Sequence, residues 1–240
     1  YLASSLVNAM ATGGSGIEEE GNEDGFWTKA IITTKHYTNY AAQYLRRGSN
    51  VSIGIRSLMD TQAKTILDGV SSGAIGGVMS SYGRTNGIPN SISPLIQWMQ
   101  SFGPWTKDGG IFLLTDFSSD WQLYEDNVLS NGYDESYTPE YKEALALLMM
   151  ARTTHTCAND SSSLEKPNTK YQDEFVLELE NGTMGVDYED LYLTASSAVT
   201  QLIRCGVFNE RDENGYPVAY PFTEYSAGYG DVAYDSSNEE

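Results

Sequence analysis

Short apolar runs suited to buried strands alternate along this chain with longer stretches whose apolar residues have helical spacing. The short runs are residues 30–34, 77–81 and 111–114, and turn residues bound each of them. Runs of four or five apolar and β-branched residues are too short for helices and fit strands that are buried on both faces. We therefore predict three strands at these positions.

Helical spacing predicts helices before, between and after these strands. One helix is expected over residues 2–11, before Gly13 and Gly14, and another begins at Ser93 and Pro94. One helical face holds the apolar residues Ile55, Leu58, Met59, Ala63, Ile66, Leu67 and Val70. Two later helices are predicted over residues 139–151, packed on the sheet, and 190–205. The inward residues of the last helix are predicted to be Ala195, Val199, Leu202 and Ile203.

The order strand, helix, strand, helix, strand is typical of an α/β fold with a parallel sheet. Each predicted strand ends in polar side chains: Lys35 and His36 after the first, Tyr82 after the second and Asp116 after the third. In a barrel of parallel strands these ends share one face, which carries the catalytic residues. A simpler alternative remains open for each residue: Asp116 caps the next helix, His36 is structural, Lys35 is a solvated surface residue and Tyr82 packs in a barrel core.

Composition narrows the classes of function. The 240 residues include 33 Asp and Glu against 14 Lys and Arg, so the formal charge of −19 makes nucleic acid a poor partner. A neutral sugar is not repelled by such a surface. The longest wholly apolar run, residues 144–151, is shorter than the roughly 20 residues that a membrane span needs. Residues 1–10 show no signal peptide, although the chain can begin at an internal or processed end.

The amino-acid composition changes after residue 206. Tyrosines recur at positions 216, 220, 225, 229 and 234, and Pro217 and Pro221 oppose a regular helix. We therefore divide the chain into a barrel portion, residues 1–209, and an extended Tyr-rich acidic linker or arm, residues 210–240.

Three segments together resemble a known family. They are Lys35-His36-Tyr37-Thr38, the run from Val78 through Ser81-Tyr82-Gly83-Arg84-Thr85-Asn86-Gly87 to Pro89, and Leu114-Thr115-Asp116. Their order and spacing are similar to the catalytic (β/α)8 TIM-like barrel of glycoside hydrolase family three, and to its xylosidase branch in particular. Residues 198–209 resemble the closing helix of that barrel, so the resemblance covers most of residues 1–209.

The resemblance implies a retaining, exo-acting β-glucosidase or β-xylosidase that hydrolyses terminal β-linked sugars of a small sugar or oligosaccharide. Asp116 would be the nucleophile that forms a covalent glycosyl-enzyme. Lys35, His36 and Tyr82 would bind the sugar, and Arg84 and Asn86 would shape the loop beside it. The acid/base residue has no assigned position, no cofactor or metal is implied, and we expect an extracellular or periplasmic protein.

The chain also departs from the family pattern. The family usually has Ser and then Trp or Cys around the nucleophile, where this chain has Thr115 and Phe117, and it usually has Asn at the position of Gly83. These changes motivate an alternative, a non-catalytic sugar-binding or assembly subunit on a degenerate barrel. The family's first barrel strands have no counterpart after Tyr1, so we expect the chain to need that missing N-terminal part, or a second domain or chain, in order to fold.

Other motifs are weaker. Ser163 and Lys166 have a Ser-x-x-Lys spacing without its companion motifs. Residues 20–25 and 210–215 resemble calcium loops but lack the closing Glu, and His155 and Cys157 are too few for zinc. Trp98, Trp105 and Trp121 could line a sugar subsite or be buried. Cys157 and Cys205 could pair or remain free thiols.

Overall fold

The structure, a computed structural model, describes residues 2–41, 43–44, 46–99, 101, 110–116, 119, 123, 137–151, 169–213, 218 and 220–222. The elements in chain order are α1 (Leu2–Ser15), β1 (Thr33–Tyr37), β2 (Asn50–Val51), α2 (Ile55–Ser57), the π-helical turn η1 (Leu58–Gln62), α3 (Lys64–Ser72), β3 (Gly77–Ser80), β4 (Arg84–Thr85), β5 (Ile88–Pro89), the 3₁₀ turn η2 (Asn90–Ile92), α4 (Pro94–Met99), β6 (Phe112–Thr115), α6 (Pro139–Met150), α8 (Thr169–Glu180), the 3₁₀ turn η4 (Thr183–Gly185) and α9 (Tyr188–Arg204).

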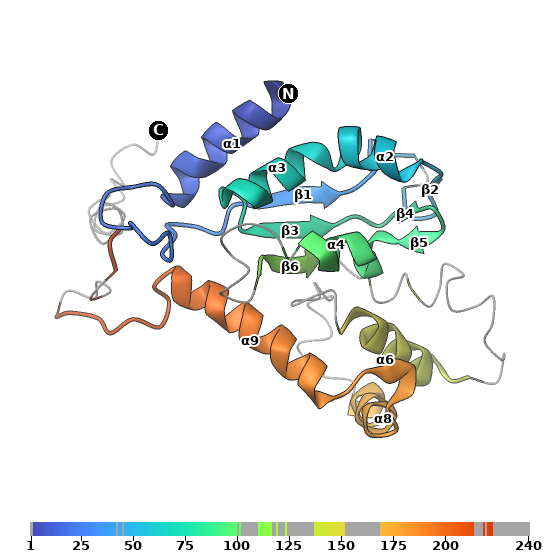
Figure 1. Cartoon of the computed structure of the whole chain (residues 1–240). Helices are drawn as coiled ribbons and strands as arrows, with labels where there is room; N and C mark the ends of the chain where they lie inside the picture. The colour runs from blue at the N-terminus through green and yellow to red at the C-terminus, as the bar shows by residue number, and fades with distance from the viewer. Residues whose placement is uncertain are drawn as a thin grey trace, which may run out of the picture.

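A three-stranded parallel sheet in the order β1-β3-β6 lies at the centre of the structure (Figure 1). Thr33 pairs with Gly77, and Gly77 pairs with Phe112, so the three strands start level with one another. The three predicted strands and their parallel arrangement are confirmed. The first strand lies three residues later than predicted, because Lys35 and His36 belong to β1 itself instead of following it.

A second, small sheet has the order β2-β4-β5 and lies beside the carboxyl ends of β1 and β3 (Figure 1). The loop that Arg84 and Asn86 were expected to shape is instead a tight antiparallel hairpin of β4 and β5. Asn86 and Gly87 occupy its turn with φ angles of 54° and 85°. An Asn-Gly pair adopts such positive φ angles readily, and it is a strong hairpin signal.

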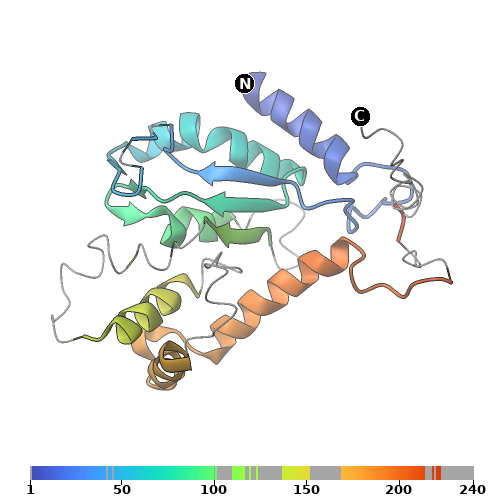
Figure 2. The same ribbon diagram turned by 180° about the vertical axis from the view of Figure 1, so that it is seen from behind.

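The main core lies between the central sheet and its helices. Helices α1 and α3 run along one side of the sheet and contact each other, as both views show (Figures 1 and 2). The predicted apolar face over residues 55–70 is confirmed except at Ile55, which is exposed. The buried members of this core are Ala11, Ile17, Tyr37, Ala63, Ile66, Val70, Ala74, Ile75, Val78, Ile96, Met99, Ile111 and Leu113.

Helix α6 belongs to a second apolar cluster. The helix begins where predicted, with the Thr138 side chain accepting a hydrogen bond from the Tyr141 amide. It packs mainly against α8, which the sequence analysis did not predict, so the expected packing of α6 on the sheet was wrong. The shared buried residues are Leu123, Leu145, Ala146, Leu148, Met150, Ala151, Leu179 and Val186.

Helix α9 has the opposite orientation from the one that its apolar pattern predicts. Its buried residues are Ser197, Gln201 and Arg204, whereas Ala195, Val199, Leu202 and Ile203 are exposed. Polar contacts fix this orientation: the Gln201 amide donates to the Gly110 carbonyl, and Arg204 Nη2 donates to the Gly25 carbonyl over 2.8 Å. The apolar side of α9 therefore faces outward within the described chain.

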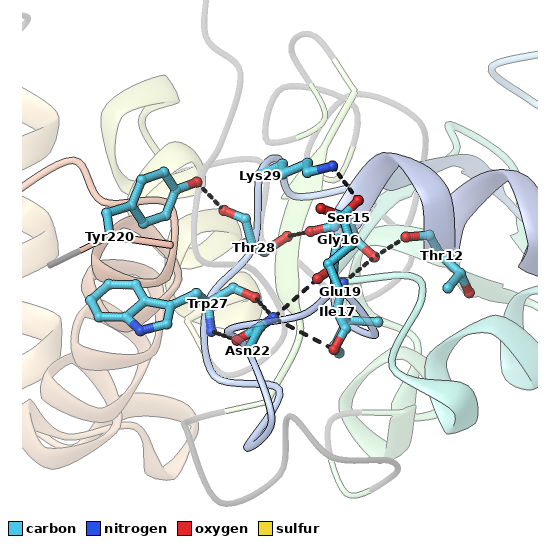
Figure 3. Close-up of polar contacts among 10 residues, drawn as sticks. All are labelled: Thr12, Ser15, Gly16, Ile17, Glu19, Asn22, Trp27, Thr28, Lys29 and Tyr220. Carbon is cyan, nitrogen blue, oxygen red and sulfur yellow. Dashed lines mark hydrogen bonds and ion pairs between the residues drawn. The ribbon is translucent and has the colours of Figure 1, made fainter. Parts of the chain in front are cut away.

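Asn22 organises the turn between α1 and β1 (Figure 3). Its Nδ2 atom donates to the Trp27 carbonyl at 2.8 Å and to the Gly16 carbonyl at 3.1 Å, and its Oδ1 atom accepts from the Trp27 amide at 2.9 Å. Asn22 is only 2% exposed. Its hydrogen bonds therefore satisfy backbone groups that water cannot reach. The same turn contains an ion pair between Lys29 and Glu19.

The first residues of the predicted arm return to this turn. The Tyr220 hydroxyl donates to the Thr28 carbonyl over 2.6 Å (Figure 3). Tyr220 and Phe222 are both buried. The Tyr220 ring also lies edge-on to Trp27, at 5.6 Å between centroids. The division of the chain at residue 209 stays a prediction, and most of residues 210–240 lie outside the described part.

The described strands form an α/β arrangement and do not close a barrel. In the central sheet β1 and β6 each pair with a strand on one side only. Among the described helices, none is both long and apolar enough to cross a membrane. Cys205 is a free thiol, whereas Cys157 lies outside the described residues.

We expect Asn22→Ala to lower the free energy of unfolding by about 2–3 kcal/mol, because several buried backbone groups lose their partner. Urea denaturation followed by tryptophan fluorescence measures this change. Asn181→Ala, at an exposed position, is the matched control and should change stability by less than about 0.5 kcal/mol. Equal stabilities of the two variants would contradict a structural role for Asn22.

Candidate active site

The carboxyl ends of the three central strands bring the predicted site residues to one edge. Tyr37 pairs with Ser80, and Ser80 pairs with Thr115, so the residues beside and after these pairs emerge together. His36 comes from β1, Tyr82 follows β3 and Asp116 follows β6. The Lys35–His36 and Tyr37–Thr38 peptide bonds are cis.

His36 and Asp116 contact each other although β3 lies between their strands. The distance from His36 Nε2 to Asp116 Oδ2 is 3.2 Å, and each side chain is about one-fifth exposed. Burial lowers the pKa of His36 below its usual value of 6.5, and the Asp116 carboxylate raises it in part. The imidazole is therefore neutral at pH 7 and provides both a donor and an acceptor.

Two tyrosines complete the wall of this site. The Tyr40 ring lies 5.0 Å from the His36 ring and 6.3 Å from the Tyr82 ring, measured between centroids. Burial, and then the charge of Asp116, raises the pKa of Tyr82. Its hydroxyl thus remains protonated at neutral pH and can donate a hydrogen bond near Asp116.

Two neighbouring arginines lie over these rings. The guanidinium carbons of Arg46 and Arg47 are each 5.4 Å from the centroid of Tyr82, and that of Arg46 is 6.0 Å from the centroid of Tyr40. Tyr40, Arg46 and Arg47 are not among the predicted site residues, because residues 38–50 show neither strand nor helix periodicity. The tandem arginines in a strongly acidic chain were the signal that could have identified them.

Asn90, which is fully buried, holds the backbone around the site. Its Nδ2 atom donates to the Thr38 carbonyl at 3.0 Å and to Ser81 Oγ at 2.8 Å. Its Oδ1 atom accepts from Thr85 Oγ1 at 2.9 Å. One amide thus joins the segment after β1, the segment after β3 and the β4–β5 hairpin, which fixes the positions of Tyr40 and Tyr82.

Gly83 allows residues 46–49, a loop that carries Arg46 and Arg47, to approach Tyr82. A Cβ atom at this position would lie 2.8 Å from Ser49 Oγ, closer than side chains pack. The Ser49 carbonyl accepts from the Arg84 amide at 2.8 Å, and Ser49 Oγ donates to the Arg46 carbonyl at 3.1 Å. The glycine that departs from the family pattern therefore accompanies a close contact with the loop that carries Arg46 and Arg47.

The remaining predicted residues have different positions. Lys35 is exposed and affects His36 electrostatically, but it forms no ion pair with Asp116 in the described part of the chain. It also lines a hollow of about 460 Å³ between α1 and β1, which does not include Asp116. Asn86 exchanges two hydrogen bonds of 2.8 Å with the Ile53 backbone, so it clamps the hairpin. Arg84 lies in β4.

Several weaker predictions fall outside the described residues, namely those on His155, Cys157, Ser163, Lys166, Trp105 and Trp121. Trp98 is described and is 43% exposed on α4. Among the described residues no group of His, Cys, Asp and Glu side chains could hold a metal ion.

Neither a family model nor a curated protein sequence matches this chain. The fold, however, is similar to solved glycosidase structures. A GH3 exo-β-xylosidase (XlnD), in complex with a xylobiose aziridine activity-based probe, superposes with a TM-score of 0.61 over 85% of this chain at 17% identity. A β-glucosidase from Listeria innocua in complex with glucose gives 0.58 over 85% at 19% identity.

A β-glucosidase from Erythrobacter marinus likewise gives a TM-score of 0.58 over 86% of this chain at 17% identity. The chain spans about a quarter of each of these proteins: 24% of the xylosidase, 25% of the Listeria enzyme and 24% of the Erythrobacter enzyme. The predicted resemblance to glycoside hydrolase family three is thereby confirmed at the level of the fold.

We expect Asn90→Ala to destabilise the protein by about 2–3 kcal/mol, because the Thr38 carbonyl and the hydroxyls of Ser81 and Thr85 lose a buried partner. Thermal and urea unfolding measure this loss. Gln97→Ala, at an exposed position on α4, serves as the control and should be nearly neutral. A neutral effect of Asn90→Ala would show that this amide does not hold the strands' ends.

The contact between His36 and Asp116 can be tested without any substrate. We expect an NMR titration to give His36 a pKa below 6.5, and a still lower pKa in Asp116→Asn, because the carboxylate that stabilises the imidazolium is removed. Asp60→Asn, on the exposed η1 turn, should leave the pKa of His36 where it was. A rise in the pKa of His36 in Asp116→Asn would contradict the geometry.

Proposed function

We propose that this chain is part of the (β/α) barrel of a retaining, exo-acting β-glycosidase of the β-glucosidase or β-xylosidase type. The supporting observation is the 3.2 Å contact between His36 and Asp116, with Tyr82 at the same edge of a parallel sheet. The similarity to glycosidase structures supports the same class of fold. The substrate would be a small sugar or oligosaccharide with a terminal β-linked residue.

In this proposal Asp116 is the nucleophile. Its carboxylate attacks the anomeric carbon, the bond to the leaving oxygen breaks, and a covalent glycosyl-enzyme forms that water then hydrolyses. His36, and Lys35 from the same strand, would donate hydrogen bonds to the sugar hydroxyls. The protonated Tyr82 hydroxyl would donate to Asp116 or to the bound sugar, which favours an orientation of the carboxylate suitable for attack.

A retaining mechanism also needs a second carboxyl group, roughly 5–5.5 Å from the first, as acid and base. Among the described residues, the side chains around Asp116 are those of His36, Tyr40, Tyr82, Arg46 and Arg47, and none of these is a second carboxyl group. We therefore propose that the second carboxyl group comes from another part of the full-length protein or from a partner chain.

Two surfaces support a missing partner for this chain. The outer edge of β1 pairs with no strand of the described chain, and the exposed apolar side of α9 includes Tyr192, Val199 and Leu202. Open strand edges and large apolar faces are normally covered in a stable protein. We propose that an N-terminal barrel portion, or a second domain or chain, covers them.

We also propose that the whole protein acts outside the cytoplasm, in the extracellular space or the periplasm.

The role of Asp116 predicts a clear loss of function. Asp116→Asn in the full-length protein should lower kcat/KM for aryl β-glucosides and β-xylosides at least about a thousandfold, because the amide cannot form the glycosyl-enzyme. In the wild-type protein, a 2-deoxy-2-fluoro glycoside should lose its leaving group and add the mass of its fluoroglycosyl group to the peptide that contains Asp116. Activity is measured by release of the aryl alcohol, and circular dichroism checks the fold.

Asp60→Asn is the matched control, since it removes one exposed carboxylate away from the site, and it should retain activity. Full activity of Asp116→Asn would refute the proposed nucleophile. Binding of glucose or xylose by the wild-type protein without any turnover would instead favour the alternative, a non-catalytic sugar-binding or assembly subunit.

A further inference from the structure

Tyr40 has a hydroxyl group whose proton meets no acceptor in the described part of the chain. The hydroxyl oxygen is buried and makes no hydrogen bond there. The guanidinium carbon of Arg46 lies 6.0 Å from the centroid of the Tyr40 ring, but a guanidinium group can only donate, so it cannot take the tyrosine's proton. A buried donor without an acceptor lowers stability, and such groups in folded proteins are few.

The segment after β1 fixes Tyr40 at the candidate site. Asn39, directly before it, has a φ angle of 56°, which asparagine adopts more readily than most residues, and its Nδ2 atom donates to Thr85 Oγ1 over 2.9 Å. The Tyr40 ring lies 5.0 Å from the His36 ring and 6.3 Å from the Tyr82 ring. The backbone thus holds this tyrosine beside two of the predicted site residues.

Electrostatic effects also connect Tyr40 with Asp116. Burial raises the pKa of Tyr40, the charge of Arg46 lowers it, and the charge of Asp116 raises it again. The net shift is upward, so the hydroxyl stays protonated at neutral pH and remains a donor. The Asp116 carboxylate is near enough to act on this group, yet it accepts no hydrogen bond from it.

We infer that Tyr40 is a substrate-binding residue, whose hydroxyl donates a hydrogen bond to a hydroxyl oxygen of the sugar at Asp116. This inference rests on the proposed glycosidase function and adds a residue to its sugar-binding set. A sugar hydroxyl oxygen is an acceptor, so the ligand supplies the partner that the free protein lacks. The Arg46 side chain, which lies over the ring, is long and has several rotamers, so it can move aside without any change in the backbone.

The inference predicts that the hydroxyl serves binding and not folding. Tyr40→Phe removes this group and keeps the ring, so the urea midpoint of the free protein should not fall, because no hydrogen bond is lost. Tyr44→Phe is the matched control: it makes the same chemical change four residues later, where the side chain is 83% exposed, and it should leave the midpoint unchanged.

Kinetics of the full-length protein test the contact itself. The substrate is 4-nitrophenyl β-D-glucoside or β-D-xyloside, whichever the wild type hydrolyses faster. Tyr40→Phe should lower kcat/KM about five- to tenfold, the loss expected for one hydrogen bond between neutral groups, and Tyr44→Phe should keep the wild-type value.

Monodeoxy derivatives of the same substrate locate the acceptor. For the derivative that lacks the accepting oxygen, the wild type and Tyr40→Phe should have the same kcat/KM, because the contact is already absent. For every other derivative the variant should stay about five- to tenfold below the wild type.

The outcomes separate the inference from the function on which it rests. Hydrolysis by the wild type with an unchanged kcat/KM in Tyr40→Phe would overturn the inference and leave the proposed glycosidase intact. A fall in the urea midpoint of Tyr40→Phe, or an equal loss on every deoxy derivative, would also overturn it, because the hydroxyl would then act through the fold. No hydrolysis of either parent substrate by the wild type would refute the proposed function and the inference with it.

Discussion

The parallel pairing of β1, β3 and β6 is the constraint on which the candidate site depends. Parallel strands in register deliver their carboxyl ends to one edge, and neighbouring strands are about 4.8 Å apart. The backbones of the two outer strands, β1 and β6, are therefore about 10 Å apart. The side chains of His36 and Asp116 span this gap over the end of β3 and come within 3.2 Å of each other. A slip of one residue in either outer strand would turn these side chains to the opposite face.

Two buried asparagines maintain this register from opposite ends. Asn22 holds the turn that leads into β1, and Asn90 joins the segments that leave β1 and β3. Each amide satisfies backbone groups that water cannot reach, so each contributes to stability through the cost of leaving those groups unpaired. The site is thus built on polar contacts at both ends of the strands and on apolar packing between them.

The sequence predicts the strands well because short β-branched and apolar runs bounded by glycines are too short for helices and suit few secondary structures other than buried strands. It predicts the orientation of α9 poorly, because Gln201 and Arg204 turn toward backbone carbonyls of distant residues that periodicity does not reveal. Within the candidate site, His36, Tyr82 and Asp116 can be predicted from the sequence, because each lies at or just after the end of a predicted strand. Arg46 and Asn90 do not, since their positions depend on loops whose contacts span long stretches of chain.

The attachment of Tyr220 to Thr28 has a consequence for any later part of the polypeptide. Thr28 precedes β1, so Tyr220 lies near the amino-terminal edge of the sheet, whereas Asp116 follows β6 at the carboxyl edge. A five-residue strand is about 17 Å long. A tether that carries a catalytic group from Phe222 to Asp116 must cover at least that span along the outside of the molecule, which takes on the order of five extended residues. Deleting residues from such a tether would separate the two reacting groups while leaving both of them chemically intact.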